Sequence, residues 1–135
     1  MTLTDEKQKE LIHQAVEVRE KAYAPYSNYQ VGAALLTKSG DIFTGVNVEN
    51  AAYPVTMCAE RSAVFSAVSA GERDFKAIAV ATQNGGTPCG SCRQVLSEFG
   101  LDIDVLLVDD KGKLIQKSTV RELLPGAFQK GDLTE

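Results

Sequence analysis

The chain has 135 residues, which at roughly 100 to 200 residues per domain predicts one domain spanning residues 1–135. Its 44% hydrophobic and 24% charged residues match soluble globular proteins and exclude disordered, collagen-like and disulfide-scaffold classes. A net charge of -4, without a cationic cluster, disfavours a nucleic acid partner. The longest apolar run, residues 31–36, is far below the ~20 residues of a membrane span. No signal-peptide pattern is visible, so we expect a cytoplasmic location and no membrane partner.

The expected elements follow from hydrophobic spacing and from turn residues. Apolar residues at i, i+3 and i+4 predict an N-terminal helix that Pro25 ends, and the turn at 39–41 predicts an antiparallel hairpin. Thr56 is expected to cap the second helix. The elements are, in order, a helix at 4–23, strands at 30–37 and 42–48, a helix at 57–70, a strand at 76–82, a helix at 89–99, strands at 103–109 and 114–118, and a helical turn at 120–124.

This order of elements predicts an α/β fold. Helices that alternate with strands cover both faces of a sheet, so we expect three α-β-α layers around a mixed sheet of about five strands. Cys58 lies at the start of one predicted helix, and Cys89 and Cys92 at the start of the next. Two helix N-termini should therefore meet, and their partial positive charge favours thiolates over thiols.

The pattern of the three cysteines predicts a catalytic zinc site. Cys89 and Cys92 form a CxxC directly after Pro88, and Cys58 stands 31 positions before Cys89 and two before Glu60. Three thiolates without a fourth protein ligand leave one position open, as catalytic rather than structural zinc sites do.

Three other interpretations of the cysteines remain. A closed structural zinc site needs a fourth ligand, and the only histidine, His13, lies far upstream in the first predicted helix. A thioredoxin-like redox CxxC leaves Cys58 and Glu60 unexplained. Three simple buried cysteines are the last possibility, because free cysteine is often buried.

Two arginines adjoin the expected metal ligands. Zinc with three thiolates carries a net charge of about -1, which opposes deprotonation of a bound water. Arg61 and Arg93 are expected to donate hydrogen bonds to the ligand sulfurs and so to compensate this charge. The alternative for each arginine is an ordinary salt bridge.

Five motifs follow one another in order along nearly the whole chain. Three of them are Tyr-Ser-Asn-Tyr-Gln-Val-Gly-Ala-Ala at 26–34, Gly-Val-Asn-Val-Glu-Asn at 45–50 and Leu-Leu-Pro-Gly-Ala-Phe at 123–128. The other two, Cys-Ala-Glu at 58–60 and Pro-Cys-x-x-Cys at 88–92, match the zinc deaminase signature, with Cys in place of His. With these five motifs the chain resembles the small, homotetrameric, zinc-dependent class of cytidine deaminases.

The resemblance implies a role for each matching residue. Cys58, Cys89 and Cys92 would hold one Zn²⁺ per subunit, and Glu60 would be the general acid and base. The substrate contacts would be Asn47 and Glu49 to the ribose 3′-hydroxyl, Tyr29 beside the pyrimidine, the backbone of Ala59 to the base, and Phe128 reaching into a neighbouring subunit. Tyr29 stands where the family usually has Phe, and its hydroxyl needs a partner.

Taken alone, these positions allow simpler explanations. Asn47 and Glu49 alternate on a predicted strand, so they share a face that could be merely solvated. Tyr29 and Phe128, without the resemblance, would more often be core aromatic residues.

The implied reaction is hydrolytic deamination of cytidine and 2′-deoxycytidine in pyrimidine salvage. Glu60 would take a proton from the water, give it to N3 of the base and help to protonate the leaving amine. A deaminase of a cytosine-containing antibiotic, like the blasticidin S deaminases, is the nearest rival, and the Asn-x-Glu-Asn run at 47–50 favours the nucleoside. A polynucleotide editor and a non-catalytic zinc-binding interaction module are more distant alternatives.

Overall fold

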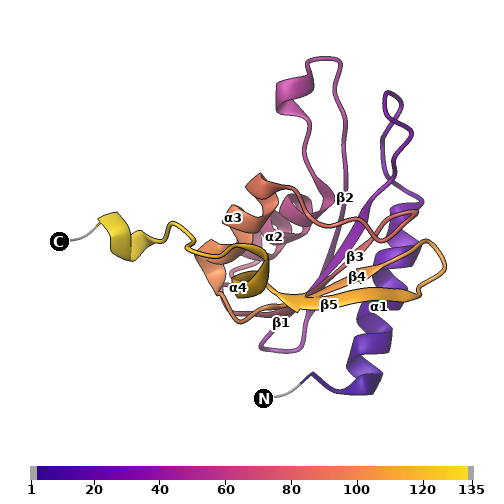
Figure 1. Cartoon of the computed structure of the whole chain (residues 1–135). Coiled ribbons are helices and arrows are strands. Elements are labelled where there is room, and N and C mark those ends of the chain that lie inside the picture. The colour runs from indigo at the N-terminus through magenta and orange to yellow at the C-terminus, as the bar shows by residue number, and fades with distance from the viewer. Residues whose placement is uncertain (1–2, 134–135) are drawn as a thin grey trace.

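A five-stranded mixed sheet in the order β2-β1-β3-β4-β5 forms the centre of the fold (Figure 1). The structure, a computed structural model, describes residues 3–133. Its elements are α1 (Asp5–Arg19), β1 (Gly32–Thr37), β2 (Ile42–Val46), the 3-10 helix η1 (Tyr53–Val55), α2 (Ala59–Ser69), β3 (Phe75–Ala81), α3 (Gly90–Phe99), β4 (Asp104–Val108), β5 (Leu114–Thr119), α4 (Val120–Leu123) and the 3-10 helix η2 (Lys130–Leu133).

The pairing of the strands follows from the lengths of their connections. The turn after β1 closes the predicted antiparallel hairpin, in which Gly32 lies opposite Val46 and Leu36 opposite Ile42. β1 also pairs antiparallel with β3, and β4 with β5. β3 and β4 are parallel, because α3 carries the chain back across the sheet between them.

Helices cover both faces of the sheet, so the predicted three-layer α-β-α fold is confirmed. Alternate residues of β1 enter different cores, since side chains alternate along a strand. Ala34 and Leu36 pack in a cluster with Leu11 of α1. Ala33 and Leu35 pack in a second cluster on the other face, which also contains buried residues of α2 and α3. None of the helices within residues 3–133 is long and apolar enough to cross a membrane.

Two glycines of the sheet let helices pack directly against its backbone, because a glycine has no side chain in the way. A Cβ on Gly45 of β2 would lie 2.4 Å from the Ala63 nitrogen and 2.7 Å from the Ala59 oxygen, both in α2. A Cβ on Gly32 of β1 would lie 2.3 Å from the Ala15 oxygen of α1. The close approach at Gly45 fixes the start of α2 against the sheet, and the close approach at Gly32 fixes α1.

The first helix is shorter than the sequence predicts. It ends at Arg19 rather than near Tyr23, because the backbone of Tyr23 leaves the helix to form a bridge with Val48. In this bridge the Tyr23 nitrogen donates to the Asn47 oxygen at 3.0 Å. The apolar spacing of the helix therefore continues past the point where tertiary pairing ends it.

The second helix begins two residues later than expected. Met57 forms a bridge with Val48, and Cys58 rather than Thr56 is the N-cap residue of α2. The Thr56 hydroxyl instead accepts a hydrogen bond from the Asn50 nitrogen at 3.2 Å. The predicted cap at Thr56 is therefore wrong, and the correction places the Cys58 sulfur at the helix terminus itself.

Candidate metal centre

The helix N-termini bring the three cysteines together. Cys58 is the N-cap residue of α2 and Cys89 is that of α3, each with an extended backbone. Cys92 lies in the first turn of α3, and its nitrogen donates to the Cys89 sulfur at 3.5 Å. The positive ends of two helices thus lie next to the sulfur atoms, as the sequence predicts.

The three sulfur atoms fit one zinc ion. The Cys58 and Cys89 sulfurs lie 3.9 Å apart, those of Cys89 and Cys92 3.4 Å apart, and all three within 4.8 Å of one another. Zn–S bonds of about 2.3 Å in a tetrahedron place sulfurs roughly 3.8 Å apart, and thiolates are ligands that zinc prefers. Across residues 3–133, no histidine or carboxylate joins this cluster, and His13 instead faces Glu17 on α1 at 3.5 Å. The donor set therefore supplies three ligands rather than four.

Arg61 lies beside the cluster and interacts with it electrostatically. Its Nη2 donates to the Cys58 sulfur at 3.2 Å. The pKa of Cys58 falls to about 5 because the Cys92 thiol, and then Arg61, donate hydrogen bonds to its sulfur. The same bond to Cys58, together with burial, raises the pKa of Cys92. In the protein without metal, the negative charge of this pair therefore resides on Cys58.

Arg93 is predicted from the sequence to bond to a ligand sulfur, but it bonds to two backbone oxygens instead. Its Nε donates to the Pro88 oxygen at 2.9 Å and its Nη1 to the Leu123 oxygen at 2.7 Å. Among the hydrogen bonds described for residues 3–133, none runs from Arg93 to a sulfur. Its guanidinium joins the start of α3 to the end of α4, so of the two arginines only Arg61 makes the expected hydrogen bond to a sulfur.

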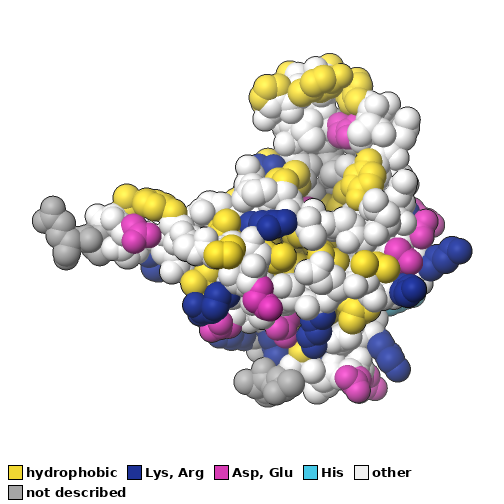
Figure 2. Space-filling model, viewed as in Figure 1, with side chains coloured by type: hydrophobic (Ala, Val, Ile, Leu, Met, Phe, Trp, Pro, Cys, Tyr) yellow, Lys and Arg dark blue, Asp and Glu magenta, His cyan; other side chains and the backbone are white. Residues whose placement is uncertain are grey.

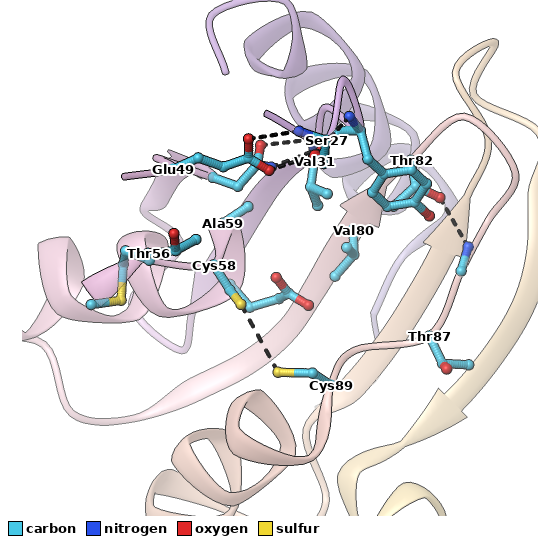
Figure 3. Close-up of a pocket in the computed structure, with 15 residues that line it drawn as sticks. Ser27, Val31, Glu49, Thr56, Cys58, Ala59, Val80, Thr82, Thr87 and Cys89 are labelled. Atoms are coloured by element: carbon cyan, nitrogen blue, oxygen red, sulfur yellow. Dashed lines mark hydrogen bonds between the residues drawn. The ribbon is translucent and has the colours of Figure 1, made fainter. Parts of the chain in front are cut away.

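A cavity of about 320 Å³ adjoins the cluster (Figure 3). This volume lies within the range of small-molecule sites. No lysine or arginine is among the described residues that line it. The predicted site residues that the structure brings to its wall are Cys58, Cys89, Glu60, Ala59, Asn47, Glu49 and Tyr29.

Glu60 is the buried acid of the cavity. It lies in the first turn of α2 and is only 5% exposed. Burial, and then the negative charge on Cys58, raises its pKa to about 7. A carboxyl group with this pKa can both take and give a proton near neutral pH.

Asn47 and Glu49 share one side of the cavity, and both are held by hydrogen bonds. The Asn47 side chain accepts from the Val31 nitrogen at 2.9 Å and donates to the Tyr29 oxygen at 2.8 Å. Glu49 accepts from the backbone nitrogens of Tyr26 and Ser27 at 3.0 and 3.1 Å, and also from the Ser27 hydroxyl. These bonds, above all that from the Ser27 hydroxyl, lower the pKa of Glu49, so its carboxylate stays charged.

The remaining predicted contacts are divided between the cavity and the exterior. Tyr29 lines the cavity, and its hydroxyl donates to the Asn84 side-chain oxygen at 2.8 Å. Ala59 is fully buried at the first position of α2. Phe128 is 56% exposed on the C-terminal segment, which extends away from the sheet (Figure 1). Within this chain, Phe128 therefore lies outside the cavity.

Sequence reasoning gave no role to Ser27, Thr82 or Asn84. Ser27 belongs to the motif at 26–34 and lies two residues before Tyr29, and this position could have identified it as a residue of the site. Thr82 lines the cavity at the end of β3. Asn84 contacts Tyr29 across 55 positions of the chain, and such a contact leaves no local pattern in the sequence.

Known proteins match both the sequence and the fold. The family model for the cytidine and deoxycytidylate deaminase zinc-binding region matches residues 5–108. A cytidine deaminase of Sporosarcina psychrophila is 52% identical over 92% of this chain and 93% of its own length. A blasticidin-S deaminase of Bacillus cereus is more distant, at 36% identity over 86% of this chain and 88% of its own.

Solved structures agree with the sequence matches. The crystal structure of a cytidine deaminase from Burkholderia pseudomallei has a TM-score of 0.84 and 50% identity, covering 88% of this chain and 97% of that chain. Because the family model covers most of the chain and the fold agrees, the predicted family is confirmed. The chain belongs to the cytidine and deoxycytidylate deaminase family, whose zinc-binding region it carries.

Proposed function

We propose that this chain catalyses the hydrolytic deamination of cytidine and 2′-deoxycytidine to uridine and 2′-deoxyuridine, with release of ammonia. One observation carries this proposal: three sulfurs lie within 4.8 Å of one another, and two of their cysteines, Cys58 and Cys89, line one cavity together with the buried Glu60. Relatives that are named cytidine deaminases support the choice of substrate. Residues 1–135 act as one domain in this proposal.

Cys58, Cys89 and Cys92 hold the zinc ion in this proposal. Zinc supplies Lewis acidity, which lowers the pKa of a water molecule from ~15.7 toward ~7 and makes it a nucleophile at neutral pH. Arg61, whose Nη2 donates to the Cys58 sulfur at 3.2 Å, withdraws negative charge from the three thiolates. This arginine therefore favours deprotonation of the water.

Glu60 moves the protons of the reaction. Its carboxylate takes a proton from the attacking water and transfers it to N3 of the pyrimidine as oxygen adds to C4. It then takes the remaining proton of the added water from the C4 hydroxyl and gives it to the amine, which leaves as ammonia. A pKa near 7, caused first by burial, suits both transfers because neither protonation state is strongly disfavoured.

Asn47 and Glu49 bind the ribose. Asn47 Nδ2 carries two hydrogens and uses one on the Tyr29 oxygen, so a second remains for a sugar hydroxyl. Glu49 is charged and held by Tyr26 and Ser27, and its oxygens retain acceptor capacity for the 3′-hydroxyl. Since both contacts concern the 3′-position, ribose and 2′-deoxyribose substrates are both accepted.

The base lies between Tyr29 and the start of α2. Ala59, fully buried at the first helical position, offers its backbone to the base. Tyr29 presents its ring at the cavity wall. The absence of lysine and arginine from the described lining suits an uncharged nucleoside rather than a polynucleotide.

The chain assembles as a homotetramer in this proposal. Large hydrophobic side chains at Tyr26, Tyr53 and Val55 are exposed, and Figure 2 shows hydrophobic surface gathered around the projecting segment that carries η1. Exposed patches of this kind are typical of protein interfaces. Phe128, 56% exposed on a segment that extends from the sheet, then reaches the cavity of a neighbouring subunit.

Pyrimidine salvage in the cytoplasm is the proposed setting. Free cytidine and deoxycytidine arise from nucleic acid breakdown, and deamination converts them to uridine and deoxyuridine. The metal centre needs all three cysteines as thiolates, and a reducing compartment keeps thiols from forming disulfides.

A direct assay tests the proposed function. The zinc-loaded protein is incubated with cytidine, and the fall in absorbance and the ammonia released are followed together. We expect one ammonia per cytidine lost, and free cytosine to be a substrate poorer by up to roughly 10⁴- to 10⁵-fold, because the groups that bind ribose are left unpaired. Turnover of blasticidin S without turnover of cytidine would favour the rival reaction, and equal turnover of cytosine would refute the role of Asn47 and Glu49.

A further inference from the structure

Two loops that form walls of the cavity are joined by a side-chain hydrogen bond. The first contains Tyr29 and precedes β1, and the second spans residues 83–87 between β3 and α3. Tyr29 Oη donates to Asn84 Oδ1 at 2.8 Å. Tyr29 and Gly86 line the cavity, whereas Asn84 is not among the described lining residues. Asn84 can therefore act on the cavity only through its neighbours.

Asn84 is also bonded within its own loop. Its Oδ1 accepts a second hydrogen bond, from the Thr82 hydroxyl at 3.3 Å. Thr82 Oγ1 in turn accepts from the Gly86 nitrogen at 2.9 Å. Figure 3 shows Thr82 at the cavity wall formed by the end of β3. The oxygen that holds Tyr29 is thus fixed by the hydrogen bonds that shape the loop.

Close contacts limit movement of this loop. A Cβ on Gly86 would lie 2.8 Å from the Tyr29 hydroxyl, so the hydroxyl lies directly against the Gly86 backbone. A Cβ on Gly85 would lie 2.5 Å from Ile115 of β5. The loop is therefore packed between Tyr29 on one side and β5 on the other.

We propose that Asn84 is a positioning residue, which through the Tyr29 hydroxyl holds the aromatic ring and the loop at 83–87 in the conformation that receives the nucleoside. The inference rests on the proposed function, because Tyr29 is taken to face the pyrimidine. Without the bond, the ring loses the contact that fixes it to the loop, and substrate binding must order the ring again. This effect weakens binding of the substrate more than it slows the chemical step.

A double-mutant cycle tests the pair. Tyr29→Phe removes the donor and keeps the ring, and Asn84→Ala removes the acceptor. Each should raise the KM for cytidine roughly 2- to 10-fold, the range of one net hydrogen bond, with kcat nearly unchanged. The double variant should show no larger KM than the single variants, since both remove the same bond. Asn84→Asp keeps an acceptor oxygen and should keep the KM close to that of the wild type.

Gly86→Ala provides an independent test by steric displacement. The backbone of Gly86 is not in the left-handed region, so an alanine fits the local conformation. The one contact that its Cβ makes too short is that with the Tyr29 hydroxyl. The variant should raise the KM for cytidine, and adding Tyr29→Phe should lower it again to the value of Tyr29→Phe alone. The dissociation constant of the product uridine, measured by calorimetry, should change in parallel.

Three outcomes would overturn the inference. Unchanged KM values in the single variants would show that the bond does not shape the cavity. If the increases in KM of the two single variants multiply in the double variant, the two residues act separately. A fall in Tm with an unchanged KM would show that the bond has a purely structural role. A wild-type chain that does not turn over cytidine refutes the proposed function as well, so the two failures are distinguishable.

Discussion

Replacing the buried acid, Glu60→Gln, should stabilise the metal-free protein in a pH-dependent way. The carboxyl group is 5% exposed, and burial together with the charge of Cys58 raises its pKa from 4.5 to about 7. Between these values the folded protein retains a proton that the unfolded chain has released. The free energy of unfolding therefore falls as the pH rises through this window.

The size of the effect follows from the two pKa values. The rise of the pKa from 4.5 to about 7 corresponds to about 3 kcal/mol of lost stability at pH 8, and to less than about 1 kcal/mol at pH 5. Gln has nearly the same shape and no charge to desolvate. The variant should accordingly be more stable than the wild type at pH 8 and nearly equal to it at pH 5.

Urea unfolding after treatment with a chelator measures this difference. Wild type and variant are compared at pH 5 and pH 8, with the m-value as a check that both expose the same surface. Comparison of the two proteins cancels the titration of groups that do not interact with Glu60. A stability difference that is the same at both pH values would refute the reasoning that burial sets the state of Glu60.

The same substitution should have the opposite effect on catalysis. In the zinc-loaded protein, loss of a general acid and base should lower kcat by roughly 10²- to 10⁴-fold. The zinc content should stay unchanged, because Glu60 is not one of the three sulfur ligands. Zinc loss in the variant would instead make Glu60 a metal ligand and contradict its assignment.

The remaining predictions concern the metal, the ribose and the fold. Arg61→Ala should weaken zinc binding roughly 10- to 100-fold in competition with a chelator, because a bond to the Cys58 sulfur is lost, and wild-type affinity would argue against this role. Glu49→Gln should raise the KM for cytidine but not for cytosine, and equal increases for both would show that Glu49 does not bind ribose. Gly45→Ala should destabilise the protein by about 1 to 3 kcal/mol or more and lower activity, since a Cβ would displace the start of α2, whereas an unchanged unfolding curve would contradict the close contact.

Local patterns in the sequence predict the elements better than their ends. Hydrophobic spacing and turn residues predict the four α-helices and five strands found within residues 3–133, because each buries one face or one stripe, but they do not predict the 3-10 helices η1 and η2. The end of α1 and the start of α2 are set instead by Val48, which bridges both Tyr23 and Met57. Those contacts join residues far apart in the chain, so no local rule contains them.

The sequence predicts the residues of the site that lie at the starts of helices. Cys58 and Cys89 follow strands and precede helices, so their sulfurs converge once the sheet forms. Arg93 stands next to a ligand in the sequence, but its guanidinium bonds to the Leu123 oxygen 30 residues away. Asn84 contacts Tyr29 by a similar long-range bond. The directions of long side chains therefore depend on packing that the sequence does not reveal locally.

Titration of the metal-free protein with zinc, with cytidine turnover measured after each addition, tests the central claim most directly. The account predicts no turnover without metal, a rise in proportion to the zinc added, and a plateau at one equivalent per chain, because one group of three sulfurs holds one ion. Full turnover by protein shown to contain no metal, or a plateau that persists after Cys92→Ser, would contradict it.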